Sequence, residues 1–124
     1  MSESTEMYLE TILVLHLRNG DVHATDIAKE MHFSKPTISQ QMKRLVKAGY
    51  VSIDGNNHIS LTDSGMKIAT DIYARHNKLS EIFEYIGISK EQAVADACRI
   101  EHYISPETFE ALKAYFDPKM HTEN

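Results

Sequence analysis

Apolar residues recur every three or four positions along most of the chain, which is the spacing of one buried face on an α-helix. These stripes predict helices over about residues 4–18, 25–31, 34–48, 62–86, 90–104 and 105–116. One stretch instead has the two-residue period of β-strands, because residues 50–53 and 58–61 alternate on either side of a turn-forming Asp-Gly-Asn-Asn segment. The pattern therefore predicts a mainly α protein with a single hairpin.

The third predicted helix has the clearest start and the clearest faces. Ser34 is a good N-cap, and Pro36 suits a first turn because it has no amide hydrogen to leave unpaired. Its expected inner stripe comprises Ile38, Met42, Leu45 and Val46, and its outer face comprises Thr37, Gln40, Gln41, Lys43, Arg44 and Lys47. A short helix, a tight turn and a helix with polar and cationic side chains are typical of a helix-turn-helix, and the following hairpin adds a wing.

The helix predicted from Thr62 to about residue 86 is long for a chain of 124 residues. Its expected stripe comprises Met66, Ala69, Ile72, Tyr73, His76, Leu79 and Phe83. Such a helix would connect the winged helix-turn-helix, residues 1–72, to an all-helical domain, residues 73–124. The two short helices after it cannot enclose a core alone, so their leftover apolar face predicts a symmetric homodimer, and the polar tail from Asp117 is expected to fray.

Composition and charge narrow the function classes. With 42% hydrophobic and 25% charged residues, no long apolar run and an acidic N-terminus, the sequence favours a soluble cytoplasmic protein without a membrane partner. The net charge of −5 argues at first against nucleic acid, but Ser34 to Lys47 contains four cations and no acid. Its single cysteine excludes an internal disulfide and leaves a thiol for other chemistry.

Several potential metal ligands lie at helical spacing. Cys98, Glu101 and His102 stand at i, i+3 and i+4 on the helix predicted over 90–104, so they would share one face, which the apolar Val94 and Ala97 continue. A thiol, a carboxylate and an imidazole that face a core need partners, and a divalent cation satisfies all three. Met7 and Glu10 form a second such pair on the first helix, and His76 is a third candidate.

Four segments in this order resemble the diphtheria-toxin-repressor-like metalloregulators, which include iron-dependent repressors and manganese transport regulators. They are Thr5-Glu6-Met7-Tyr8-Leu9, Pro36-Thr37-Ile38-Ser39-Gln40, Leu61-Thr62 with Gly65, and Ala97-Cys98-Arg99-Ile100-Glu101-His102. The likeness covers about residues 5 to 116.

The resemblance implies particular ligands and DNA contacts. The activating site of the iron-responsive branch falls on Met7, Cys98, Glu101 and His102, while a further glutamate of the manganese branch falls on Glu10. His76 matches a histidine of a neighbouring metal site, but Val94 and Ser80 stand where the iron branch has a histidine and a glutamate. Family DNA contacts fall on Ser34, Pro36, Thr37, Ser39 and Gln40.

These observations predict a metal-dependent transcriptional regulator that binds a palindromic operator as a homodimer, and the resemblance implies that it acts as a repressor. A thioether and a thiolate in place of hard carboxylates favour Fe²⁺ over Mn²⁺ as the cellular effector, while Zn²⁺, Co²⁺ or Ni²⁺ could bind in vitro. Lys35, Lys43, Arg44 and Lys47 are expected to bind phosphates; Thr37, Ser39 and Gln40 to contact base edges; and Pro36 to contact a thymine methyl.

Three alternatives stay open at this stage. One is a manganese-responsive regulator of the same family, and another is a winged-helix regulator that answers to a non-metal effector. The third is a zinc enzyme built on the Cys/Glu/His cluster, which the absence of an evident general base and of a glycine-rich substrate loop disfavours. We therefore expect neither enzymatic activity nor a small organic substrate.

Overall fold

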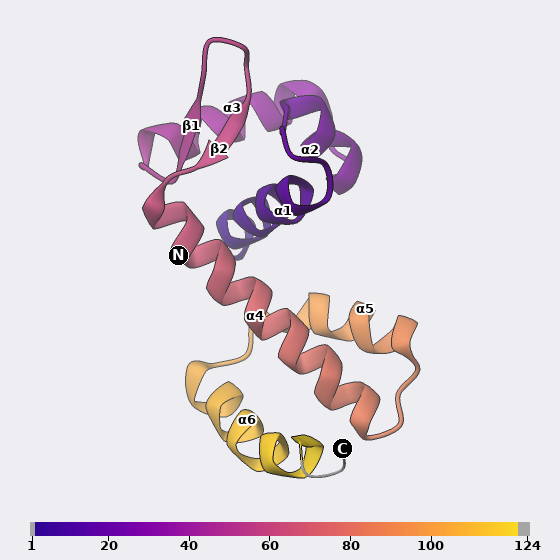
Figure 1. Cartoon of the computed structure of the whole chain (residues 1–124). Helices are drawn as coiled ribbons and strands as arrows, with labels where there is room; N and C mark the ends of the chain where they lie inside the picture. Colours follow the sequence, from indigo (N-terminus) through magenta and orange to yellow (C-terminus); the bar gives the residue numbers. More distant parts are fainter. Residues whose placement is uncertain (1, 122–124) are drawn as a thin grey trace. The chain divides into compact units, whose positions relative to one another are not determined.

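A computed structural model describes residues 2–121 of the chain, which form six helices, two strands and two compact units. The first unit extends to Asp71 and the second begins at Ile72, so the division falls within the helix α4 (Asp63–Tyr85) (Figure 1). The fold class predicted from the sequence, a winged helix-turn-helix followed by an all-helical part, is confirmed.

Three helices and a hairpin build the first unit. Helix α1 (Glu3–Asn19) is capped by the Ser2 side chain and ends at Gly20, whose φ of 85° needs glycine. Its apolar stripe, which includes Leu9 and Ile12, is almost completely buried. Helix α2 (Ala24–Met31) places Ile27 in the same core and ends at His32, which adopts the left-handed conformation with φ of 59°.

Helix α3 (Lys35–Lys47) starts where its sequence predicts. The Ser34 side chain accepts a hydrogen bond from the Thr37 amide, and Pro36 lies in the first turn. Ile38, Met42 and Leu45 are fully buried, as expected. Val46 is 42% exposed, so its assignment to the inner stripe is wrong: at the end of the helix this position has already turned away from the core.

The predicted wing is present as strands β1 (Val51–Ile53) and β2 (Ile59–Leu61), which pair antiparallel with Val51 opposite Leu61. The turn between them is held by Asp54, whose carboxylate accepts from the amides of Asn56 and His58. These bonds, chiefly the one from His58, stabilise the charged carboxylate and hold the pKa of Asp54 below its usual value. The wing is therefore a short ladder closed by a well-bonded turn.

The connection from the wing into α4 is tightly packed. Thr62 donates through its hydroxyl to the Gly49 carbonyl and accepts from the Gly65 amide, while its own amide donates to the Tyr50 carbonyl. A Cβ at Gly65 would fall against the Tyr50 carbonyl oxygen, well inside van der Waals contact. The Leu61-Thr62-Gly65 segment thus ties the wing to the helix that follows.

Helices α4, α5 (Lys90–Ile100) and α6 (Pro106–His121) make the second unit. Ile72, Leu79, Ile82, Ala93 and Ala97 form its core, whereas α6 has no fully buried residue. Lys78 of α4 forms an ion pair with Asp117 of α6 at 2.7 Å. This small core leaves Tyr85, Ile86, Ile88, Val94, Tyr103 and Tyr115 exposed.

Four expectations about helices α4 to α6 are wrong. Helix α5 ends at Ile100 rather than at 104, α6 continues to His121 instead of fraying from Asp117, and Met66 and Val94 are 38% and 41% exposed rather than on buried stripes. The Lys78 ion pair explains the second difference, because it holds Asp117 within the helix. The end of the predicted tail, residues 122–124, lies outside the described residues. None of the described helices is long and apolar enough to cross a membrane.

Substitution of Gly65 by alanine should destabilise the first unit by about 1–3 kcal/mol, because the added methyl group must displace the backbone at Tyr50. Urea denaturation followed by circular dichroism measures the loss. Ser64→Ala, at the neighbouring exposed position, is the matched control and should change stability little. Equal stability of both variants would show that the wing and α4 are not packed this closely.

The ion pair of Lys78 with Asp117 should make the stability of the second unit depend on pH. The hydrogen bond from Lys78 lowers the pKa of Asp117 from 3.8, so the pair stabilises the fold above that value and is lost as pH falls through the folded-state pKa. We expect Asp117→Asn to lower the urea midpoint at pH 7 and this deficit to shrink as the pH falls below 3.8, while Glu110→Gln, which removes an exposed carboxylate of the same helix, shifts the midpoint much less at pH 7. A deficit of Asp117→Asn that grows as the pH falls, or a deficit of Glu110→Gln of equal size at pH 7, would contradict this.

Candidate functional site

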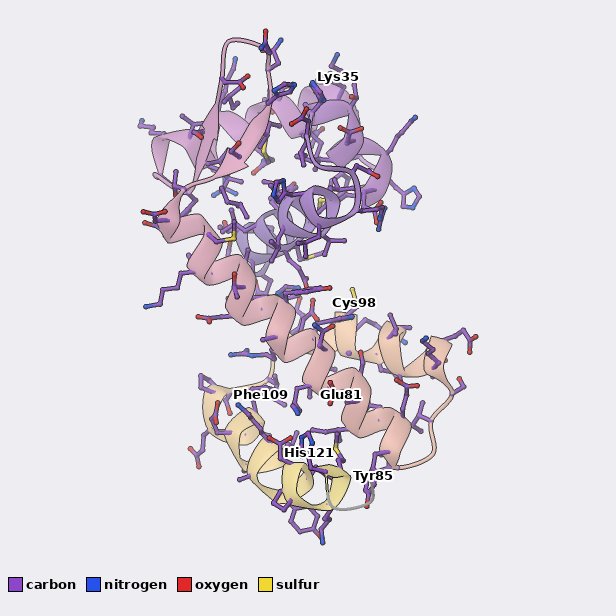
Figure 2. All side chains as sticks on the ribbon, in the orientation of Figure 1. Lys35, Glu81, Tyr85, Cys98, Phe109 and His121 are labelled. Atoms are coloured by element: carbon purple, nitrogen blue, oxygen red, sulfur yellow. The ribbon has the colours of Figure 1, made fainter. Side chains whose placement is uncertain are left out.

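The first unit presents the start of α3 to solvent. Lys35, Pro36, Thr37 and Gln40 are exposed and Ser39 is half-buried; Figure 2 labels Lys35 at this end of the helix. The Ser34 hydroxyl donates to the Thr37 hydroxyl at 2.8 Å, so the Thr37 hydroxyl keeps its own hydrogen to donate outward. The arrangement supplies polar donors and acceptors on a rigid helix end, as base recognition requires.

A hollow of about 420 Å³ is lined by residues of both α3 and the wing. Lys35, Ser39 and Lys43 line it from α3, while Asn57 lines it from the wing and His23 from the start of α2. The apolar residues Met42, Ile53 and Ile59 also line it. Two cations beside apolar side chains could bind a sugar-phosphate strand, which combines charge with a hydrophobic deoxyribose.

The cations of α3 are not equivalent. The Arg44 guanidinium donates to the Thr5 hydroxyl of α1 at 3.3 Å and to the Gln41 amide oxygen at 3.0 Å. Lys43 and Lys47 are exposed. Arg44 therefore links α3 to α1 in addition to presenting positive charge, a role that the outward position in the helical pattern did not suggest.

The wing base contains a further cluster that the sequence analysis did not identify. The rings of His23 and His58 meet edge to face at 4.7 Å, and Nδ1 of His58 lies 3.2 Å from the Asp54 carboxylate. The only part of this cluster that the sequence could have indicated is Asp54, because an aspartate in a turn often accepts backbone hydrogen bonds. The cluster fixes the wing beside the start of α2.

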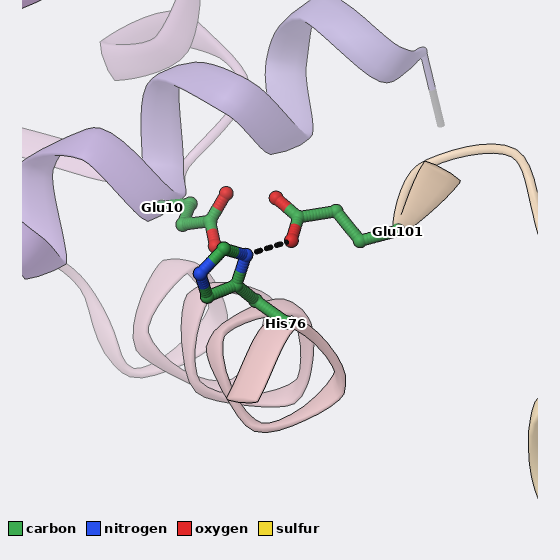
Figure 3. A group of neighbouring side chains, drawn as sticks. All are labelled: Glu10, His76 and Glu101. Atoms are coloured by element: carbon green, nitrogen blue, oxygen red, sulfur yellow. Dashed lines mark hydrogen bonds and ion pairs between the residues drawn. The ribbon is translucent and has the colours of Figure 1, made fainter. Parts of the chain in front are cut away.

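In the second unit, His76, Glu101 and His102 come together. Nδ1 of His76 lies 2.7 Å from Oε2 of Glu101 (Figure 3). Nε2 of His102 lies 3.1 Å from Oε1 of the same carboxylate. The Glu101 side chain is completely buried, and the two imidazoles are 18% and 3% exposed. Each oxygen of a buried carboxylate thus faces an imidazole nitrogen. When neutral His76 donates through Nδ1, its Nε2 carries the lone pair that a metal would need.

Cys98 does not share a buried helix face with Glu101, contrary to the spacing argument. It lies on α5 and is exposed (Figure 2). Glu101 follows the last residue of that helix and is completely buried. Met7, 41% exposed, and Glu10, half-buried, both belong to α1 in the first unit. The second unit thus brings together three of the six predicted ligands.

The positions of the predicted neighbouring metal site offer little to a cation. Ser80 is buried and its hydroxyl has no hydrogen-bond partner among the residues that the structure describes, while Val94 is apolar. The His76, Glu101 and His102 cluster is different, because its chemistry fits a divalent cation. A buried anion costs free energy unless it is compensated, and imidazole and carboxylate are common ligands of first-row transition metals.

Two family models account for nearly the whole chain. The model "Iron dependent repressor, N-terminal DNA binding domain" matches residues 1–59, and "Iron dependent repressor, metal binding and dimerisation domain" matches residues 62–121. The fold and the residues above therefore belong to a metal-dependent transcriptional regulator. The chain is a member of the iron-dependent repressor family, which confirms the resemblance drawn from its sequence.

The relatives of this chain include several transcriptional regulators. The chain is 33% identical to an uncharacterised helix-turn-helix-type regulator of Methanocaldococcus jannaschii, over 94% of this chain and 95% of that one. It is 31% identical to the transcriptional regulator MntR of Salmonella typhimurium, over 91% of this chain and 72% of MntR. With the iron-dependent repressor IdeR of Mycobacterium tuberculosis it shares 34% identity, over 83% of this chain but 45% of IdeR.

The fold matches solved regulators as well. The structure of the manganese regulator SloR superposes with a TM-score of 0.76 at 27% identity, over 94% of this chain and 55% of SloR. The chain thus spans about half the length of IdeR and SloR but nearly all of the archaeal relative. Both an iron-dependent and a manganese regulator are among these proteins, so the family alone does not assign the metal.

Proposed function

We propose that the chain is an iron(II)-activated repressor that binds a palindromic operator as a homodimer. The buried Glu101 carboxylate between His76 and His102 is the observation that carries this proposal. Together with Cys98 and, from the first unit, Met7 and Glu10, these residues would supply the metal ligands.

The donor atoms favour iron over manganese. Met7 offers a thioether and Cys98 a thiolate, and such soft ligands bind Mn²⁺ poorly relative to later divalent ions. Zn²⁺, Co²⁺ and Ni²⁺ should bind the isolated protein, while metal availability selects Fe²⁺ in the cell. A manganese-responsive role is the second candidate, favoured by the similarity to MntR and to SloR.

The distribution of ligands over two units supplies a mechanism for activation. Met7 and Glu10 belong to the unit that carries α3, whereas Cys98, Glu101 and His102 belong to the other. An ion bound by both groups would restrict how the units move and hence the spacing of the two α3 helices in a dimer. Half-sites about 34 Å apart, or a multiple of this, would then be read by both protomers.

A second copy of the chain would cover the exposed apolar residues of the second unit. Tyr103 and Tyr115 are 73% and 61% exposed, and α6 buries none of its residues completely. Exposed apolar side chains that lie close together are typical of a protein–protein interface. A symmetric dimer would also place two copies of α3 on one DNA duplex.

On DNA, the exposed lysines of α3 would bind phosphates. Lys35 and Lys43 flank the hollow beside the wing and Lys47 follows one turn later, while Arg44 would add charge from its place against α1. Ser34, Thr37, Ser39 and Gln40 would contact bases or the nearby backbone, and Pro36 a thymine methyl. A non-metal effector is the remaining alternative, and DNA binding that is indifferent to metal would favour it.

Selection of random duplex DNA under anaerobic conditions tests the proposed function. We expect a palindrome to be enriched with Fe²⁺ present and not with a chelator, and His102→Ala to lose this difference. Anisotropy titrations of the selected duplex should show tighter binding with metal by about 5- to 150-fold, the usual range of allosteric coupling. Equal affinity with Fe²⁺ and with chelator would reject the metal switch.

Lys43→Gln tests the DNA surface in the same titrations. Loss of one phosphate contact should weaken binding to all sequences alike and reduce the slope of log affinity against log salt by about one. Lys67→Gln, at an exposed lysine of α4, is the matched control and should leave that slope unchanged. The same slope in both variants and the wild type would exclude Lys43 from the DNA interface.

Metal preference is tested by exchanging the two soft donors. Met7→Asp combined with Cys98→Glu should shift the ratio of Mn²⁺ to Co²⁺ affinity toward Mn²⁺ by about tenfold or more, because oxygen ligands replace sulfur. Chelator competition measures both affinities. Met31→Asp with the native Cys98 is the control, since Met31 lies on α2 and is not a proposed ligand. An unchanged ratio would mean that Met7 and Cys98 do not hold the ion.

A further inference from the structure

The turn that carries Glu101 and His102 lies beyond the end of a helix, so its backbone needs other partners. Helix α5 ends at Ile100, and α6 begins at Pro106. Within the turn, the amides of Tyr103 and Ile104 both donate to the Ile100 carbonyl at 2.9 Å. The carbonyls that follow the last helical residue require donors from outside the turn, as at any helix end.

Arg75 supplies those donors. Its Nη1 atom donates to the Glu101 carbonyl at 3.0 Å and to the Ile104 carbonyl at 3.3 Å. The guanidinium also lies over the Phe109 ring of α6, 5.3 Å from the ring centroid; Figure 2 labels Phe109 near the start of this helix. A guanidinium that donates to two backbone carbonyls and lies over an aromatic ring has few conformations available.

Arg75 directly precedes His76 on α4. The two neighbours hold Glu101 at both ends, since Arg75 bonds its backbone carbonyl and His76 bonds its carboxylate at 2.7 Å. The position of Glu101 relative to His76 is thus set by two adjacent residues of α4, one of which is the arginine. Such a residue restricts the ligands before any ion arrives, which lowers the entropy cost of binding.

We propose that Arg75 is a positioning residue for the metal site, which holds the Glu101–His102 turn in the geometry that binds the ion. It touches neither the ion nor the DNA in this role. The inference rests on the proposed function, because it presupposes that His76, Glu101 and His102 belong to the metal site.

Cobalt(II) titration of the full-length chain under anaerobic conditions tests this positioning role. Absorption bands of bound Co²⁺ report coordination geometry and thiolate ligation, and chelator competition reports affinity. We expect Arg75→Met to bind Co²⁺ about 10- to 100-fold more weakly, with shifted bands, because partners that orient ligands have effects of this size. Arg75→Lys should recover much of the affinity, since an ammonium can donate to the same carbonyls.

Lys78→Met is the matched control for a merely structural effect. Lys78 lies three residues further along α4 and also joins it to α6, through Asp117, but among the described residues its ion pairs are with Glu81 and Asp117 rather than with the turn. It should lower the urea midpoint as Arg75→Met does, yet keep Co²⁺ affinity within about twofold and leave the bands unshifted. Titrations are made where urea curves show each variant fully folded.

The outcomes separate the two proposals. A wild-type chain that binds no Co²⁺ would reject the proposed function itself. A wild type that binds Co²⁺, together with an Arg75→Met variant of equal affinity and spectrum, would reject only the positioning role. Parallel losses in Arg75→Met and Lys78→Met would also reject it, because they would trace the effect to the stability of the second unit.

Discussion

A buried carboxylate constrains the second unit more than any other single group. Glu101 has no exposed surface, and an unpaired anion at such a place would cost several kcal/mol. The imidazoles of His76 and His102 compensate the charge of the carboxylate, while the Arg75 guanidinium donates a hydrogen bond to the backbone carbonyl of the same residue. Helix α4 and the turn after α5 must therefore keep their spacing, or the charge loses its partners.

The first unit depends on close backbone contacts instead of buried charge. Gly65 allows α4 to start against the Tyr50 carbonyl, and Thr62 bonds both Gly49 and Tyr50 across the same junction. The Ser34 cap fixes where α3 begins, and Arg44 fastens its far end to Thr5. A helix held at both ends presents its outer side chains in one arrangement, which specific DNA recognition requires.

Local signals in the sequence were sufficient for the elements of the first unit. A serine followed by a proline two residues later marks the start of α3, and an Asp-Gly-Asn-Asn turn between alternating strands marks the wing, because both depend on residues close in sequence. The end of α5 could not be found this way. Tyr103 and Ile104 continue its apolar spacing, but the chain leaves the helix at Ile100, and Arg75, from another helix, bonds the carbonyls of the turn.

The candidate ligands show the same limit. Helical spacing placed Cys98, Glu101 and His102 on one face, yet Cys98 is exposed while Glu101 turns inward to contact His76 and His102, because the helix ends between Cys98 and Glu101. The link from Arg44 to Thr5 joins residues 39 positions apart, so a helical wheel could only assign Arg44 to the outer face. Burial at single positions such as Val46 depends on where a helix stops, which periodicity locates poorly.

A metal switch of modest energy requires that the ligands be stable both with and without the ion. The contacts of Glu101 meet this requirement, since the hydrogen bond with His76 and the nearby His102 imidazole compensate the carboxylate where an ion would otherwise neutralise it. Metal binding would then exchange one set of partners for another instead of filling an empty anionic pocket. The net affinity would be reduced by the contacts that must be given up, which would keep the response reversible as the metal concentration changes. A coupling of a few kcal/mol is enough for such a regulator, and a site that collapsed without its ion would respond to metal by folding rather than by releasing DNA.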